Sequence, residues 1–324
     1  MSSPGADHTV WVSTAGTGTA FGIIQSARER WGAGVRIIAA DMAPAHLVAA
    51  STLADEYVTM PAISDPTFGE RLLGELARVG ADTYVPIFDA EIVAAAELIA
   101  GGRWPAGVAA LVPELAAARV CLDKLETARW LAAEGLGAPS TELAASATWR
   151  DGGLVAKPRR GIGSVGFRAI DGPEDLARLA RAEPDYVVQE MLSRPEITID
   201  AFRAADGAFF RCACRERVEV KAGVCTKARV HDDPELLALA RAIADRLPLR
   251  GTFCVQVMRD AAGAWRVTDI NARPGAGTRL SAAVGLDFLC ATLVDAWGGD
   301  ARPLLPPLGR ERWVVRAYVE YVMR

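Results

Sequence analysis

Apolar and polar positions follow two different rhythms along the chain. In the first hundred residues, short apolar runs alternate with longer helix-like segments, as at 10–13 followed by 23–30. Strands that alternate with helices in this way predict a parallel sheet with helices on its faces. Near the C-terminal end, 255–258 and 265–270 instead indicate two strands joined by a short turn. The chain therefore predicts an α/β unit followed by a part that contains a β-hairpin.

The C-terminal hairpin carries polar side chains that alternation brings together. Asp269 and Asn271 are two residues apart and share one face of their strand, and Gln256 on the partner strand can face the same way. Carboxylate and amide oxygens without His or Cys suit a hard cation such as Mg²⁺, which relies on water and substrate phosphates for its other ligands. The hairpin predicts a metal site, and a surface hairpin with ordinary polar residues is the alternative.

Composition narrows the classes of function. The 324 residues, 51% hydrophobic and 23% charged, suit a globular protein of two or three units. A net charge of −4 without a basic block disfavours nucleic acid and anionic membranes as partners, and no run approaches the roughly 20 apolar residues of a membrane span. The six cysteines form no Cys-x-x-Cys pair, so we expect thiols in a reducing, cytoplasmic compartment.

A glycine-rich turn follows the first apolar run, with Gly16, Gly18 and Gly22 in the spacing G-x-G-x-x-x-G. A dinucleotide-binding unit needs G-x-G-x-x-G and an acidic residue for the ribose, for which Asp41 is the candidate. The third glycine is out of position, so an NAD(P)-binding oxidoreductase is the less favoured hypothesis. A tight reversal of the chain in an α/β domain also explains these glycines.

A second glycine-rich segment follows a strand predicted at 154–157. The strand ends in Lys157, and glycines at 161, 163 and 166 come next. Glycines let backbone N–H groups approach phosphate oxygens, and a lysine adds a compact cation. No Gly-Lys-Ser/Thr sequence follows, so this is not a Walker A loop. The segment predicts a nucleotide-phosphate site, with a flexible hairpin tip and solvated arginines as the alternative.

Two further segments extend this hypothesis. The apolar run at 187–192 turns polar at Gln189 and Glu190, which suits an adenine slot, with Glu196 accepting from ribose hydroxyls. A later stretch has four cations at odd positions, which predicts one cationic strand face toward a triphosphate or, alternatively, a solvated sheet face. These four are Arg215, Arg217, Lys221 and Lys227.

The order of these segments resembles the ATP-grasp superfamily, and within it a carbamoyl-phosphate-synthase-like branch of stand-alone ligases. The resemblance covers essentially the whole chain. It rests on Asp123-Lys124, Lys157 with its glycine loop, Gln189 to Leu192 with Glu196, and Gln256 with Asp269-Ile270-Asn271-Ala272-Arg273. It implies a mixed α/β and α+β fold, in which an N-terminal Rossmann-like parallel α/β domain precedes a two-lobed ATP-grasp fold. The expected units are 1–112 (N-terminal domain), 113–188 (small lobe with the glycine-rich lid) and 189–324 (C-terminal lobe with the metal site).

The resemblance also implies a role for each matching position. Catalytic roles fall on Lys157, Arg273 and Arg217, and metal binding falls on Gln256, Asp269 and Asn271. ATP binding falls on Lys124, Lys157, Gly161, Gly163, Ser164, Gln189, Glu190, Met191, Leu192, Glu196 and Lys227. Candidates for the substrate side are Asp89, Glu91, Thr278 and Arg279. The family more often has Glu where Asp269 stands and Pro where Ala272 stands. Which of the four strand cations contacts phosphate stays open.

The implied activity is that of an ATP- and Mg²⁺-dependent carboxylate–amine ligase. An acyl phosphate would be the intermediate, ADP and phosphate would be released, and Mn²⁺ would be able to replace Mg²⁺. We expect a small-molecule carboxylate and an amine as partners and leave a homodimer open. The alternatives are an ATP-dependent phosphotransferase on a small-molecule acceptor and, less favoured, the NAD(P)-binding oxidoreductase.

Overall fold

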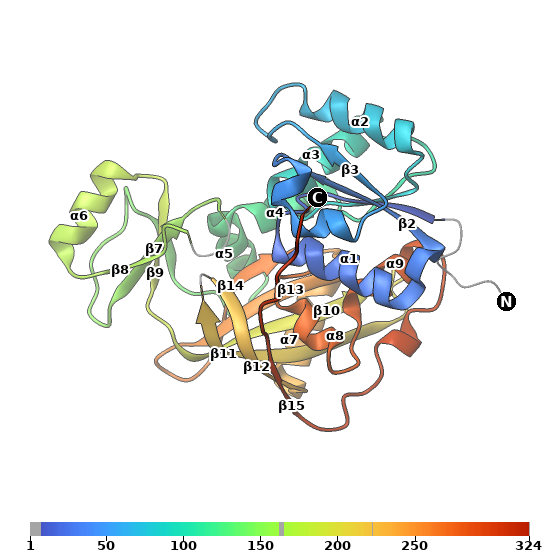
Figure 1. The fold of residues 1–324 in the computed structure, drawn as a ribbon. Helices are drawn as coiled ribbons and strands as arrows, with labels where there is room; N and C mark the ends of the chain where they lie inside the picture. The colour runs from blue at the N-terminus through green and yellow to red at the C-terminus, as the bar shows by residue number, and fades with distance from the viewer. Residues whose placement is uncertain (1–7, 162–164, 222, 324) are drawn as a thin grey trace.

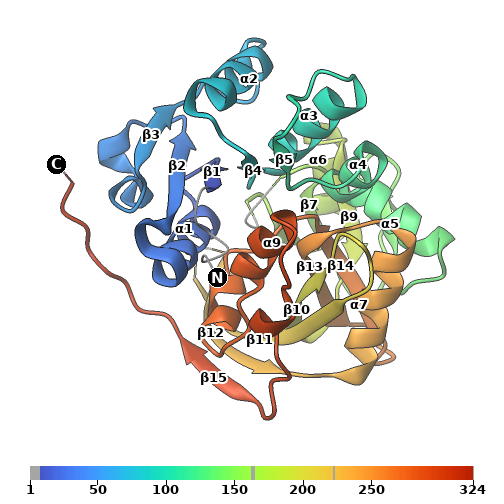
Figure 2. The ribbon, with the colours of Figure 1, turned by 90° about the vertical axis from the view of Figure 1, so that its right-hand side faces the viewer.

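Three β-sheets with helices packed on them form the computed structural model, which describes residues 8–161, 165–221 and 223–323. Figure 1 shows the smallest sheet on the left, the N-terminal sheet at the upper right and the largest sheet below it. The three sheets follow one another along the chain without interleaving. After the last strand, the chain runs past the first long helix (Figure 2). Tyr321 of this segment contacts Phe21 edge to face.

The N-terminal sheet is parallel and has five strands. They are β1 (His8–Val12), β2 (Val35–Asp41), β3 (Glu56–Thr59), β4 (Thr83–Val85) and β5 (Ala109–Ala110), in the order β3-β2-β1-β4-β5. Alternation along β1 sends Val10 and Val12 into one apolar cluster and Trp11 into another on the opposite face. Both faces of the sheet are therefore buried, and the predicted parallel α/β unit is confirmed.

Helices cover the two faces of this sheet and lead into the next unit. They are α1 (Gly18–Trp31), α2 (Phe68–Val79), α3 (Asp89–Ala100), α4 (Leu115–Leu122) and α5 (Lys124–Ala133), with short 3₁₀ turns at Gly32–Gly34, Ala45–Leu47 and Ala49–Thr52. Ile24 of α1 and Leu72 of α2 are fully buried on opposite sides. The first turn of α1 is capped by Thr17, whose hydroxyl accepts from the Ala20 N–H.

The small sheet is antiparallel, with α6 packed on one face. It consists of β6 (Thr141–Leu143), β7 (Leu154–Pro158), β8 (Arg168–Ile170), β9 (Tyr186–Glu190) and α6 (Pro173–Ala182), in the strand order β6-β9-β7-β8. Leu154 and Ala156 of β7 join Leu176 of α6 in its apolar cluster. Alternation therefore leaves Val155 and Lys157 on the opposite face of β7.

The large sheet is also antiparallel and has six strands. They are β10 (Ser193–Arg203), β11 (Phe210–Lys221), β12 (Val224–His231), β13 (Gly251–Arg259), β14 (Trp265–Asn271) and β15 (Arg312–Val315), in the order β14-β13-β10-β11-β12-β15. The accompanying helices are α7 (Pro234–Arg246), α8 (Thr278–Ala282) and α9 (Phe288–Ala296), with a 3₁₀ turn at Arg302–Leu304. Ile197 and Ile199 of β10 pack with Ile243 of α7, so the even-numbered side chains nearby face the other way.

We propose the predicted units at 1–112, 113–188 and 189–324 as the domain division of this chain. Each sheet lies within one unit, apart from β9, which continues to Glu190 and so favours a second boundary just after that residue. Helices long and apolar enough to cross a membrane are absent from the described residues.

Candidate active site

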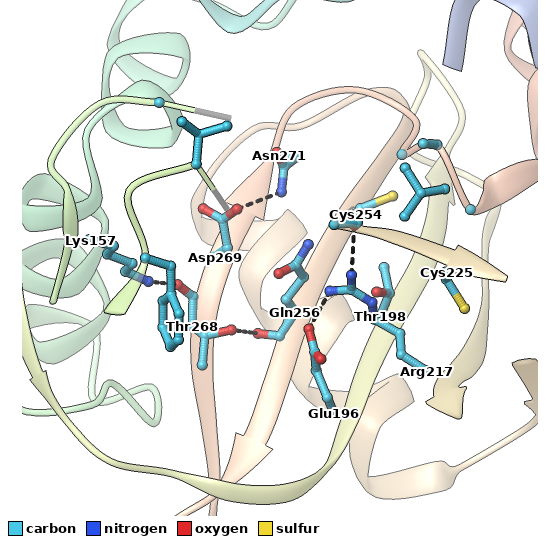
Figure 3. Close-up of a pocket in the computed structure, with 18 of the residues that line it drawn as sticks. Lys157, Glu196, Thr198, Arg217, Cys225, Cys254, Gln256, Thr268, Asp269 and Asn271 are labelled. Carbon is cyan, nitrogen blue, oxygen red and sulfur yellow. Dashed lines mark hydrogen bonds and ion pairs between the residues drawn. The ribbon is translucent and has the colours of Figure 1, made fainter. Parts of the chain in front are cut away.

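A cavity of about 610 Å³ lies where the three sheets come together. The small sheet contributes Val155 and Lys157, and the large sheet contributes the row of polar side chains drawn in Figure 3. Two threonines come from the turn before α1 and a third from the first turn of α1. Residues from widely separated parts of the sequence therefore share one solvent-accessible space. The cavity is large enough for a nucleotide-sized ligand.

The floor of the cavity is a grid set by strand register. In the antiparallel pairs, Asp269 lies opposite Gln256, Gln256 opposite Thr198, and Thr198 opposite Arg215. These four residues form one row across β14, β13, β10 and β11, on the face away from α7. The sequence predicted that Gln256 and Asp269 share a face, and the register confirms it.

The candidate metal donors occupy the β13–β14 edge of this floor. Asn271 Nδ2 donates to Asp269 Oδ2 (3.0 Å), and Gln256 lies beside Asp269 (Figure 3). Nowhere in the described residues do three or more His, Cys, Asp or Glu side chains gather as they would around a metal ion. The donor set is one carboxylate and two amides. Such oxygen donors fit Mg²⁺, which keeps several waters and takes further oxygens from phosphate.

A β-bulge sets the geometry beside these donors. The register of β13 and β14 shifts between Gln256 and Val257, which leaves Thr268 as the extra residue. Both Val267 and Ile270 can then point into the apolar core while Asp269 still faces the cavity. The Thr268 carbonyl accepts a hydrogen bond from Lys157 Nζ (2.9 Å). The bulge therefore links the small sheet to the large one next to the candidate metal donors.

Lys157 stands at the end of β7 with its amino group in a confined setting. Burial lowers the pKa of Lys157 to about 8, the Lys124 charge lowers it further, and Asp269 opposes both. A lysine held this way has lost much of its hydration and gains from a bound anion. The geometry therefore suits a phosphate ligand at this position.

Lys124 is placed by a capped helix start. Asp123 accepts from the N–H groups at the start of α5 and receives both short contacts from Arg159 Nε (2.8 Å each). Lys124 Nζ in turn donates to the Gly161 carbonyl (3.0 Å). Lys124 and Gly161 both line the cavity. The other two loop predictions, Gly163 and Ser164, lie outside the described residues.

The predicted adenine hinge lies in the cavity except at one position. Gln189, Glu190 and Leu192 line the cavity, whereas Met191 is 45% exposed and does not. Its N–H already donates to the Gly153 carbonyl (3.1 Å), and its side chain covers that glycine. The side chain of Met191 therefore points away from the space that a base would occupy, because adjacent residues of an extended chain face opposite ways.

The four strand cations separate into two pairs. Arg215 and Arg217 line the cavity, but Lys221 and Lys227 do not. Lys227 Nζ and Lys221 Nζ lie 3.0 Å and 3.6 Å from Glu219 carboxylate oxygens, on an exposed part of the hairpin. The expectation that all four share a face fails because β11 and β12 shift register on both sides of Glu219.

Arg273 lines the cavity and is fixed by an acidic partner from the N-terminal unit. Its Nε and Nη2 donate to the two oxygens of Asp89 (2.9 and 3.0 Å). Asp89 orients the Arg273 guanidinium but does not itself line the cavity. Glu91 is buried and accepts from Ser13 and from the Thr14 hydroxyl (3.2 Å), so it supports the turn before α1 in the same way.

The remaining two substrate candidates are also absent from the cavity wall. Thr278 is fully buried, with its hydroxyl donating to Asp200 (2.9 Å). Arg279 pairs with Glu29 on α1. Thr14, Thr17 and Thr19 do line the cavity, although they are not among the residues predicted for the site. The sequence carries a signal for them, because the glycine-rich turn is interleaved with threonines, but its glycines indicated only a dinucleotide-binding loop or a tight reversal of the chain.

Both oxygens of the Asp41 carboxylate are already engaged in hydrogen bonds within the protein. Its two oxygens accept from the Gly16 N–H (2.8 Å) and the Ala43 N–H (2.9 Å), and its side chain is almost fully buried. A ribose acid must present its carboxylate to the ligand. The geometry therefore disfavours the NAD(P) hypothesis.

Comparison with known proteins gives one family match. Residues 182–310 match the model described as ATP-grasp in the biosynthetic pathway with Ter operon. This range contains the hinge, the strand cations and the predicted metal donors.

Solved structures share the fold over nearly the whole chain. N5-carboxyaminoimidazole synthetase from Staphylococcus aureus, complexed with ADP, has a TM-score of 0.75 at 16% identity, covering 93% of this chain and 79% of its own. The biotin carboxylase domain of Hydrogenobacter thermophilus 2-oxoglutarate carboxylase was solved as a dimer with MgADP, ADP and bicarbonate. Its TM-score is 0.70 at 15% identity, and the match covers 90% of this chain and 70% of that domain's chain. L-amino acid ligase from Bacillus licheniformis has a TM-score of 0.71 at 14% identity, and the match covers 90% of this chain and 74% of the ligase.

The matched segment and the shared fold agree with the order of motifs along the sequence. Identities this low speak for the fold and leave the substrates of this chain open. Residues 182–310 are thus similar to an ATP-grasp family, and nearly the whole chain shares the fold of the solved structures above.

Proposed function

We propose that this protein is an ATP- and Mg²⁺-dependent carboxylate–amine ligase that works through an acyl phosphate and releases ADP and phosphate. The observation that carries the proposal is the meeting of Lys124, Lys157 and Arg273 with the donors Asp269 and Gln256 around one cavity. Cations and oxygen donors around one space are what phosphoryl transfer needs, because catalysis of that reaction is mostly positioning and charge stabilisation.

In this proposal the chain's own side chains bind the nucleotide and neutralise the charge of the reacting groups. Lys124 and Lys157 bind the phosphates, while Gln189, Glu190 and Leu192 border the base. Arg273, oriented by Asp89, neutralises charge on the transferred phosphoryl and acyl groups. None of these side chains forms a covalent bond to the substrate. An acceptor carboxylate would approach from the threonine-lined side, where the start of α1 offers N–H groups.

Gln256, Asp269 and Asn271 would hold Mg²⁺, since their oxygen donors fit it. When bound, the ion supplies charge neutralisation between the phosphates of ATP. The relatives solved with ADP and with MgADP support this choice of ligands. Mn²⁺ as a substitute, a small carboxylate and an amine as substrates, a homodimer and a cytoplasmic location remain predictions for this chain.

The first test is a screen for ADP release across pairs of acids and amines. For an active pair, we expect free phosphate in equal amount to ADP. With ¹⁸O in the acid's carboxylate, one labelled oxygen should pass into that phosphate, because the carboxylate oxygen becomes the bridging atom of the acyl phosphate. Phosphate that stays on the acceptor would indicate a phosphotransferase instead. An active pair without label transfer would contradict the acyl-phosphate route.

The pKa of Lys157 predicts how nucleotide binding changes with pH. The folded-state pKa, about 8, lies below the ordinary 10.5, and only the protonated amine attracts phosphate. The affinity for the nucleotide should therefore be highest below about pH 8. It should fall as the pH rises above that value, by at most about tenfold per pH unit. Calorimetric titration with a non-hydrolysable ATP analogue and Mg²⁺ measures this. The Lys157→Arg variant, which stays charged, should show a flatter profile, and identical profiles for the two proteins would contradict the assignment.

A further inference from the structure

Arg215 and Arg217, the two strand cations that line the cavity, differ in how their guanidinium groups are used. Arg217 donates from Nη1 to Glu196 and from Nη2 to the Gly223 carbonyl (2.9 Å). Arg215 donates from Nε and Nη2 to the two oxygens of Asp200 (3.1 Å each). Within the described residues, Nη1 of Arg215 has no hydrogen-bond partner, although Arg215 lines the cavity. Arg215 therefore keeps donor capacity for a ligand.

Asp200 receives more donors than an ordinary ion pair requires. Besides Arg215, its oxygens accept from the hydroxyls of Thr278 (2.9 Å) and Ser281 (2.6 Å) and from Cys254 Sγ (3.2 Å). Asp200 is 0% exposed and Arg215 only 2%. Burial by itself would raise the pKa of Asp200, but the Arg215 charge and these hydrogen bonds hold the pKa below its usual value. The carboxylate is thus fully satisfied, and the guanidinium it holds has one orientation.

The loop before α8 is shaped to leave room for this guanidinium. A Cβ on Gly277 would lie 2.2 Å from Arg215 Nη1, so no larger residue fits without moving the arginine. Gly275 and Gly277 both line the cavity, and the Gly275 N–H donates to the Thr278 hydroxyl (3.0 Å) that also binds Asp200. The arginine, its carboxylate and the loop form one connected unit at the cavity wall.

The position of Arg215 in the grid indicates which part of a nucleotide it faces. Arg217 pairs with Glu196, the candidate ribose acid, at one end of β10. Arg215 lies opposite Thr198, one step further along β10, in the row that contains Gln256 and Asp269. That row is the one assigned to the metal and hence to the terminal phosphates. The direction from Glu196 toward Asp269 therefore leads from ribose to the reacting end.

We propose that Arg215, held by the positioning residue Asp200, is the strand cation that contacts the terminal phosphoryl group of ATP. The inference rests on the proposed function, and it goes beyond it by choosing one of the four strand cations and naming the group that orients it. Arg217, engaged by Glu196, then belongs to the nucleoside side of the cavity. A buried ion pair that serves only the core would make the opposite prediction, namely no dependence on the terminal phosphate.

The test compares two ligands that differ by that phosphate. Calorimetry with Mg²⁺ gives dissociation constants for ADP and for a non-hydrolysable ATP analogue. In Arg215→Gln and Asp200→Asn we expect the analogue to bind about 10- to 100-fold more weakly, as for a lost hydrogen bond to a charged group, and ADP to bind nearly as in the unchanged protein. Gly277→Ala should act in the same direction, because it displaces the guanidinium and leaves both buried charges in place.

Arg211→Gln is the matched control. Arg211 lies on the same strand and pairs with Asp232 (3.0 Å), but it does not line the cavity, so both ligands should bind normally. Equal weakening of ADP and the analogue in Arg215→Gln, or no weakening of either, would overturn the role of Arg215. If a folded Asp200→Asn protein bound the ATP analogue with an unchanged dissociation constant, only the positioning role of Asp200 would be overturned. If the unchanged protein binds neither nucleotide, the proposed function fails, and this inference with it.

Discussion

Lys157→Ala is expected to lower ADP formation at least about a hundredfold and to leave the protein folded. Among the described residues, Lys157 is the cavity lysine that joins the small sheet to the bulge at Thr268, beside the predicted metal donors. Removing a preorganised cation from developing charge typically costs about 3 kcal/mol in the barrier. Steady-state ADP release with any active substrate pair measures the loss.

The same substitution should not lower the thermal stability. Burial holds the pKa of Lys157 near 8, so at neutral pH the folded state bears the cost of keeping this amine charged, about 3 kcal/mol for a shift of this size. That cost is fully present below about pH 8 and disappears as the pH rises toward the ordinary value of 10.5. Alanine removes it, and the unfolding temperature should stay equal or rise. A protein that loses activity and stability together would point to a structural role instead.

Lys221→Ala is the control for this prediction. Lys221 is also a lysine at a strand end, but it is exposed and lies near Glu219, outside the cavity. Its removal should change ADP formation less than twofold, since exposed ion pairs contribute at most about 1 kcal/mol. Full activity in Lys157→Ala would contradict the assignment of the phosphate site.

Much of the site was predictable because it depends on local strand periodicity. The spacing of Asp269 and Asn271 specifies a shared face, and a short turn makes Gln256 the natural cross-strand neighbour. The same rule failed one strand pair away. Bulges next to Glu219 shift the register of β11 and β12, and the parity that held for Arg215 and Arg217 ends there. A bulge adds one residue without a marked change in composition, so alternation in a single sequence does not reveal it.

The tertiary partners of the buried charges could not be predicted from the sequence either. Asp200 is an isolated acid within an apolar strand, and its partners come from positions 215, 254, 278 and 281. Likewise, Asp89 was placed on the substrate side from sequence, but in the fold it orients Arg273. Such contacts arise only when distant segments pack, so residue type indicates that a charge needs a partner without indicating which one.

The second prediction with a large expected effect concerns the predicted metal donors. Asp269→Asn is expected to lower Mg²⁺-dependent ADP formation by more than about a hundredfold, because the site would then present three amides and no carboxylate. Nucleotide binding measured without Mg²⁺ should change little, which separates loss of the ion from loss of the fold. Titrating Mg²⁺ against ADP release measures the requirement, and an unchanged Mg²⁺ midpoint in Asp269→Asn would remove Asp269 from the donor set.

Gln256→Glu should act in the opposite direction on ion binding. Gln256 lies directly opposite Asp269, so a carboxylate there adds a second negative charge to the same face. Hard cations bind more tightly as carboxylates replace neutral oxygens, and the Mg²⁺ midpoint should fall severalfold. Activity need not follow, because the added charge also repels the phosphates that complete the ion's shell. Tighter Mg²⁺ binding with slower turnover would therefore mean that this enzyme keeps a glutamine at 256 so that the ion is held firmly only together with its nucleotide.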